Sequence, residues 1–253
     1  MYTNTIHTFA RLALKKTSNL QQNPLSFFIG AMMAGAYVGV GIILIFNLAS
    51  TISPEYQKLI MGCTFGIALT LVLFAGSELF TGHTMYMTFG WLKKQTNLGD
   101  LSKIWAVSWL GNLAGSVFLC LIFYLSGGLE SLAGTDSLLH KIAVAKIDST
   151  AVELLAKGAL CNTLVCLALW SSARVDSDTA KCVVIFWCLL AFIASGFEHS
   201  VANMTLLTSA LIADGGSQIT ITGLSFNLFW VSLGNIIGGA GFVAFGYWKA
   251  NGH

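Results

Sequence analysis

Two long apolar stretches of this chain are each interrupted by a short polar cluster that contains a glutamate. The clusters are Gly76-Ser77-Glu78-Leu79-Phe80-Thr81-Gly82-His83 and Gly196-Phe197-Glu198-His199-Ser200-Val201-Ala202-Asn203. Ionisable side chains in mid-membrane are costly, and they usually mark a route for ions or protons. Non-helical backbone survives at that depth only where protein or a water-filled cavity surrounds it. Two interrupted segments at matching places in two halves therefore indicate a transport site.

The composition predicts an all-α integral membrane protein. Of the 253 residues, 55% are hydrophobic and 9% are charged, whereas a soluble domain has about 25% charged residues. The formal net charge of +2 is too small to suggest a nucleic-acid partner. The six cysteines show no paired C-x-x-C spacing, so we expect small buried side chains and neither a metal site nor a cofactor site.

Stretches of about 20 apolar residues are long enough to cross a bilayer as helices. Six candidates are present, and the second and fifth, which contain the polar clusters, each exceed 30 residues. We expect each of these two to consist of two helical pieces joined by a turn, within a single six-helix domain over 23–249. The candidates are 25–49, 59–90, 104–126, 152–173, 181–213 and 223–248.

Residues 1–22 precede the first candidate span and resemble no signal peptide, because they are polar and basic. Apolar residues recur there at helical spacing, with basic residues on the other faces. This pattern predicts a short amphipathic helix on the membrane surface, with a solvated tail as the alternative.

The basic residues predict the orientation. With six spans, nine lysines and arginines fall on the side of the two termini and four fall on the other side. The positive-inside rule then places both termini in the cytoplasm. The nine are Arg11, Lys15, Lys16, Lys93, Lys94, Lys103, Arg174, Lys181 and Lys249.

An internal repeat relates the two halves, about 25–126 and 152–248. Leu110-Gly111-Asn112 recurs as Leu233-Gly234-Asn235, and the second glutamate cluster follows the first by 120 residues. Each half holds three candidate spans, and an odd number of spans reverses the second half in the membrane. The sequence therefore predicts an inverted repeat with its pathway at the seam between the halves.

Each break exposes backbone N–H groups at the start of the next helical piece, which favours a small anion. Thr81 adds a hydroxyl at the first break, and His199 adds an imidazole at the second. We expect His199 to be a neutral donor or a cation in mid-path, with a purely structural histidine as the alternative. The residues expected to form and brace the turns are Gly76, Gly196, Asn203, Glu78 and Glu198, the two glutamates by accepting backbone N–H bonds.

Apolar side chains near the breaks are candidates for constrictions that exclude a hydrated anion, and ordinary helix packing is the alternative for each. They are Phe65, Leu69, Leu79, Phe80, Val165 and Phe192. Asn162, one turn before Val165, is a candidate hydrogen-bond donor to a passing substrate. Lys146, just outside the fourth span, is a candidate for attracting anions, and either residue is alternatively only interfacial.

These segments resemble the formate/nitrite transporter family of bacterial anion channels. The motifs are Glu78-Leu79-Phe80-Thr81-Gly82-His83-Thr84-Met85, Ala194 to Met204, Gly158-Ala159-Leu160-Cys161-Asn162 and Leu233-Gly234-Asn235. The resemblance implies an aquaporin-like fold, although the paired Asn-Pro-Ala motifs of aquaporins are absent. It also implies a homopentamer in the inner membrane, with one pore per protomer and Thr81 on a mobile loop opposite His199. Thr-Gly-His-Thr-Met is most similar to the nitrite channel branch.

The function expected from this resemblance is transport of nitrite and related small monovalent anions rather than enzymatic catalysis. A formate or hydrosulfide channel and a proton-coupled weak-acid transporter are alternatives within the family. A water or neutral-solute pore is a further alternative, and so is a membrane haem or redox enzyme with His83 and His199 as ligands. Whether the flux is passive or proton-coupled stays open, as do its direction and gating by the N-terminal segment.

Overall fold

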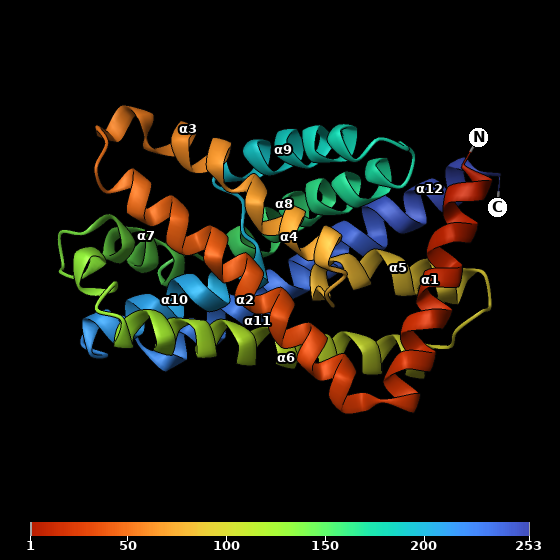
Figure 1. Cartoon of the computed structure of the whole chain (residues 1–253), viewed down its shortest axis with the longest axis horizontal. Coiled ribbons are helices and arrows are strands. Elements are labelled where there is room, and N and C mark those ends of the chain that lie inside the picture. The colour runs from red at the N-terminus through yellow and green to blue at the C-terminus, as the bar shows by residue number, and fades with distance from the viewer. Residues whose placement is uncertain (1, 253) are drawn as a thin grey trace.

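The computed structural model describes residues 2–252, which contain helices and no strand (Figure 1). The prediction of an all-α fold is confirmed. The helices are α1 (Thr3–Gln22), α2 (Pro24–Ala49), α3 (Pro54–Thr64), α4 (Gly66–Ala75), α5 (Phe80–Leu92), α6 (Leu98–Leu125), the 3₁₀ turn η1 (Glu130–Leu132), α7 (Leu138–Ile147), α8 (Ala151–Ser172), α9 (Asp178–Ala194), α10 (Ser200–Asp214), α11 (Ile221–Ile236), the π-helical segment η2 (Ile237–Phe245) and α12 (Gly246–Ala250).

Five segments within residues 2–252 are long and apolar enough to cross a membrane. They are Pro24–Ala49, Pro54–Ala75, Leu98–Leu125, Ala151–Ser172 and Ile221–Ala250. The fifth predicted span corresponds to two shorter helices, α9 with 17 residues and α10 with 15. The count of six spans therefore stays a prediction. Helical structure does stop at both glutamate clusters, between α4 and α5 and between α9 and α10.

Both chain ends lie at one end of the helix bundle, and α7 lies at the opposite end (Figure 1). A chain that crosses the membrane an even number of times has both termini on the same side. The sequence reasoning missed α7, because its 10 residues are too few for a span. The Ser137 hydroxyl begins this helix by accepting the His140 N–H, and α7 packs on α10 and α11.

The N-terminal helix α1 runs across the bundle at the end that holds the termini (Figure 1). One face of this helix, which includes Ile6, Phe9 and Ala13, is buried, while the opposite face is open. The buried face packs mainly on α5 rather than on lipid. The ring of Phe9, for example, stacks on Tyr86 at 5.0 Å between centroids. This packing fixes the position of Lys16 near the end of α1.

Two helix pairs, α2 with α6 and α8 with α11, have the most extensive contacts, and they occupy matching places in the two halves. Glycine permits this approach. A Cβ at Gly115 of α6 would overlap the backbone of Met32 in α2, and one at Gly234 of α11 would overlap the backbone of Leu155 in α8. Small residues at such contacts let helix backbones touch in lipid. The predicted repeat is thus visible in the packing.

Candidate functional site

Each break begins at a glycine with a left-handed backbone. Gly76 has a φ of 74° and Gly196 has a φ of 70°. Residues with a Cβ avoid this region, whereas glycine adopts it freely. The helix therefore ends there, and the chain turns toward the start of the next helical piece at Phe80 or Ser200.

An asparagine on a neighbouring helix holds the first break. The Asn112 side-chain oxygen accepts the backbone N–H of Phe80 at 2.9 Å. Its amide nitrogen donates to the carbonyl oxygens of Ala31 at 2.7 Å and Glu78 at 3.0 Å. One buried side chain therefore satisfies two backbone groups of the break, the Phe80 N–H and the Glu78 carbonyl, and ties the break to α2 through Ala31.

The second break has the same arrangement around Asn235. Its oxygen accepts the N–H of Ser200 at 2.9 Å, and its nitrogen donates to the carbonyls of Gly158 at 2.9 Å and Glu198 at 3.0 Å. The two asparagines are the repeated residue of the Leu-Gly-Asn motif. Sequence reasoning noticed the repeat without assigning these residues a role, and the repeat itself was the signal.

The glutamates also brace the breaks, but the prediction that they do so by accepting backbone N–H bonds was wrong. Glu78 accepts from Lys16 Nζ at 2.6 Å and pairs with His83 Nε2 at 2.9 Å. Glu198 accepts from Lys146 Nζ at 2.7 Å on both oxygens and from Asn203 Nδ2 at 2.6 Å. The carboxylates thus bind side chains rather than backbone N–H groups, because the asparagines already hold the backbone.

Lys16 is a site residue that sequence reasoning missed. From the sequence it counts only among the basic residues that predict the orientation. In the structure its side chain is 13% exposed and reaches Glu78 across 62 positions of the chain. The symmetry of the two breaks is the signal that reveals it, since Lys146 of α7 pairs with Glu198 in the same way.

Thr81 and His199 meet where the two breaks approach each other, as expected. His199 Nε2 lies 3.1 Å from Thr81 Oγ1, and both residues are buried. His199 is also the N-cap of α10, because its Nδ1 accepts the backbone N–H of Ala202 at 3.1 Å. Since Nδ1 is an acceptor, Nε2 carries the ring proton and donates to Thr81. This geometry matches the neutral donor of the two expected states.

Asn162 does not have a free amide for a passing substrate. Its Nδ2 donates to the carbonyl of Asn235 at 2.6 Å, to Thr84 Oγ1 at 2.9 Å and to the carbonyl of Thr81 at 3.2 Å. The Asn235 carbonyl lies where α11 changes to the π-helical segment η2, and such changes often occur at functional sites. The contacts make Asn162 a brace for Thr81.

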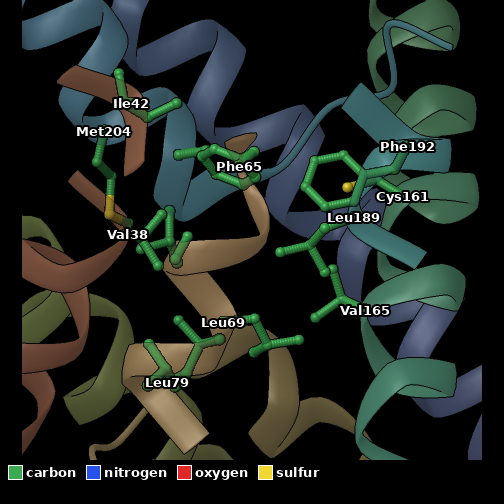
Figure 2. Close-up of a cluster of buried hydrophobic side chains, with 14 of the residues drawn as sticks. Val38, Ile42, Phe65, Leu69, Leu79, Cys161, Val165, Leu189, Phe192 and Met204 are labelled. Atoms are coloured by element: carbon green, nitrogen blue, oxygen red, sulfur yellow. The ribbon is translucent and has the colours of Figure 1, made fainter. Parts of the chain in front are cut away.

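The six candidate constriction residues are all buried in one apolar cluster. The rings of Phe65 and Phe192 meet edge to face with centroids 5.7 Å apart, and Phe192 stacks on His199 at 5.9 Å. Figure 2 shows Leu69 and Val165 next to them, brought together from α4 and α8. Leu79, also labelled there, and Phe80 complete the set.

Two cavities lie on either side of this apolar cluster. The first, which we name the Lys146 cavity, has a volume of about 270 Å³ and is lined by Lys146, Glu198, His199 and Phe192 among others. The second, the Lys16 cavity, has a volume of about 180 Å³. Its lining residues include Lys16, Ser77, Leu79, His83 and Tyr86. The two cavities, which we also call vestibules, each have a candidate constriction residue in their walls, Phe192 in the first and Leu79 in the second.

Lys146 was expected to attract anions, and the structure instead pairs its charge with Glu198. Two other lysines, Lys58 and Lys157, line the same cavity. Neither of these two lysines forms an ion pair within residues 2–252. The carboxylate near Lys157 is that of Glu153, and it binds Thr150 instead. The cavity therefore has a surplus of positive charge that does not come from Lys146.

A family model described as formate/nitrite transporter matches residues 4–249. The chain belongs to this family. The nitrite transporter NirC of Escherichia coli K12 is 49% identical over 251 residues, which cover 99% of this chain and 92% of the relative. The nitrite transporter NirC of Salmonella typhimurium LT2 is 50% identical with the same coverage. The resemblance inferred from the sequence is confirmed.

Solved structures of family members share the fold. A structure described as an FNT family ion channel superposes with a TM-score of 0.95 at 49% identity, covering 98% of this chain and 99% of that one. A structure described as a pentameric formate channel with formate bound gives a TM-score of 0.73 at 27% identity, with 89% and 96% coverage. The chain is thus a multi-pass membrane protein with the fold of these channels.

Proposed function

We propose that this protein conducts nitrite and related small monovalent anions across the bacterial inner membrane, as a homopentamer with a pore in each protomer and both termini in the cytoplasm. The observation that carries the proposal is the meeting of the two breaks at Thr81 and His199. The chain in which they meet is about half identical to two proteins named as nitrite transporters. The pentamer is supported by the solved formate channel, which is described as pentameric.

The proposed path runs from the Lys146 cavity past His199, through the apolar cluster and into the Lys16 cavity. Lys58 and Lys157 attract the anion, because their charges are not compensated within the cavity. Two helices begin at the breaks, α5 at Phe80 and α10 at Ser200. Their dipoles favour negative charge there. The apolar cluster excludes an anion that keeps its full hydration shell.

His199 acts on the anion as a hydrogen-bond donor through Nε2–H, taking the anion oxygen in place of Thr81. To donate a proton outright, the ring must first gain one at Nδ1 and release the N–H of Ala202. Stabilisation by the neutral imidazole is therefore the first role, and protonation of the anion requires a further rearrangement.

Uptake into liposomes tests the proposal. His199→Asn removes the ring donor, while asparagine remains a good N-cap for α10. We expect nitrite uptake to fall about tenfold or more, since a hydrogen bond to a charged group contributes about 1.5–3 kcal/mol. Thr81→Ser, which keeps the hydroxyl, is the matched control. Unchanged rate and pH dependence in His199→Asn would remove the histidine from the mechanism.

Formate is the second candidate substrate, because several relatives have it in their names. A probable formate transporter of Methanothermobacter thermautotrophicus is 35% identical over 239 residues, and the solved pentameric channel contains formate. Uptake of labelled nitrite in the presence of increasing formate ranks the two anions. Full inhibition at equal concentration would show that the pore does not favour nitrite.

A further inference from the structure

His83 faces the Lys16 cavity with one ring nitrogen unused. The residue is 1% exposed, and its Nε2 lies 2.9 Å from Glu78 Oε2. Because a carboxylate only accepts hydrogen bonds, Nε2 carries the proton and Nδ1 has a bare lone pair. That buried Nδ1 has no hydrogen-bond partner within residues 2–252. A buried polar atom left without a partner calls for an explanation.

The second repeat shows that bracing does not require a histidine. Asn203 holds the fifth position after Glu198, as His83 does after Glu78, and its amide donates to Glu198 Oε2 at 2.6 Å. An amide therefore serves the same bracing contact. What His83 adds is a second ring nitrogen whose lone pair is free to accept a proton.

His199 is less suited to proton exchange. Its Nδ1 already accepts the Ala202 N–H, so protonation there removes the cap of α10. His83 has no such constraint on Nδ1. Of the two imidazoles that line the vestibules, His83 is the one that takes up a proton without breaking a hydrogen bond.

We propose that His83, Glu78 and Lys16 form a proton-linked binding site for a small monovalent anion in the Lys16 cavity. This inference rests on the proposed function. The neutral Nδ1 takes the proton of the weak acid. The N–H bond forms as the O–H bond of the acid breaks, and the anion keeps the electron pair, so nothing is oxidised or reduced. The resulting imidazolium donates its new N–H to the anion.

The surrounding charges favour this occupancy. Lys16 from α1 and Glu78 from the turn before α5 cancel each other, so protonation of His83 leaves one net positive charge to balance the anion. Tyr86 of α5 contributes a phenol, with its ring centroid 6.0 Å from that of His83. The other neighbours do not titrate, since α2 presents Phe27 and α6 presents Trp105, whose indole donates to the His83 carbonyl.

The test compares nitrite uptake into liposomes between about pH 4 and 8, which extends below the range in which an unperturbed histidine changes charge. His83→Asn introduces the residue that the second repeat has at the equivalent position, Asn203, whose amide can still donate to the glutamate. His7→Asn is the matched control, because His7 is a partly exposed residue of α1 away from both cavities. At the acidic end we expect His83→Asn uptake to be about tenfold below wild type, the effect of losing a hydrogen bond to a charged group. At the alkaline end we expect no difference.

Superimposable pH profiles for wild type and His83→Asn would overturn the inference, and so would an equal loss at acidic pH in His7→Asn. If His83→Asn does not assemble, His83→Gln carries the same test with a longer amide. The absence of nitrite uptake by wild type at every pH refutes the proposed function itself. If only the inference about His83 is wrong, wild-type protein still takes up nitrite, so the two failures give different results.

Discussion

Replacing Lys146 with methionine isolates the charge pair that holds the second break. Methionine keeps the length of the apolar stem of lysine but lacks the ammonium group. Glu198, 6% exposed, then keeps only the Asn203 amide as a partner. The variant therefore leaves a buried carboxylate without a compensating cation.

The size of the effect follows from the burial of both partners, at 14% and 6% exposure. Breaking a buried ion pair from one side costs about 3–5 kcal/mol. For a chain of this length, 1 kcal/mol lowers the melting temperature by about 2–4 °C, so the expected decrease is about 6–20 °C. Adding Glu198→Gln to Lys146→Met removes the orphan charge, and it should recover more than half of the loss.

Thermal unfolding of the purified channel in detergent measures this effect. Lys141→Met is the matched control on the same helix, because Lys141 pairs with Asp136 at the exposed surface. We expect no measurable change in its melting temperature. Equal melting temperatures for Lys146→Met and wild type would refute the assignment of this pair as a brace, and so would a double variant no more stable than Lys146→Met.

The two breaks give further predictions. Asn112→Ala and Asn235→Ala each leave two buried backbone groups of a break unpaired, an N–H and a carbonyl. Each substitution should therefore lower the free energy of unfolding by at least about 2 kcal/mol, and a large effect at only one of them contradicts the matched roles. Gly76→Ala and Gly196→Ala should each cost about 1–2 kcal/mol, the penalty for a Cβ in a left-handed backbone, because neither Cβ meets another atom within 4 Å. Gly241→Ala is the control, because a Cβ there also meets no atom within 4 Å but the backbone has no positive φ. If Gly241→Ala lowers the stability as much as Gly76→Ala, the left-handed backbone is not the cause of the loss.

The breaks and their partners were predictable from the sequence because they carry local signals. Two apolar stretches longer than 30 residues, each interrupted by a polar cluster with a glutamate, predicted both turns. The internal repeat placed Thr81 and His199 in opposing halves. In the structure both glycines have a left-handed backbone, and Thr81 Oγ1 lies 3.1 Å from His199 Nε2.

The partners of the glutamates were not predictable in the same way. Lys16 lies 62 positions from Glu78, and Lys146 lies 52 positions from Glu198. Both lysines come from helices outside the apolar spans, and only packing decides where such helices lie. The role of Asn162 was misjudged for a related reason, since its acceptors come from α5 and α11. The sequence likewise does not reveal that Nδ1 of His83 has no partner within residues 2–252, because this depends on the positions of all neighbouring residues.

A structure of the channel determined with nitrite is the most direct check on the proposed path. We expect density for the anion in the Lys146 cavity of each protomer, with an oxygen about 3 Å from His199 Nε2. Density confined to the axis between protomers, with the cavities beside His199 and His83 empty in a preparation that takes up nitrite, would contradict it.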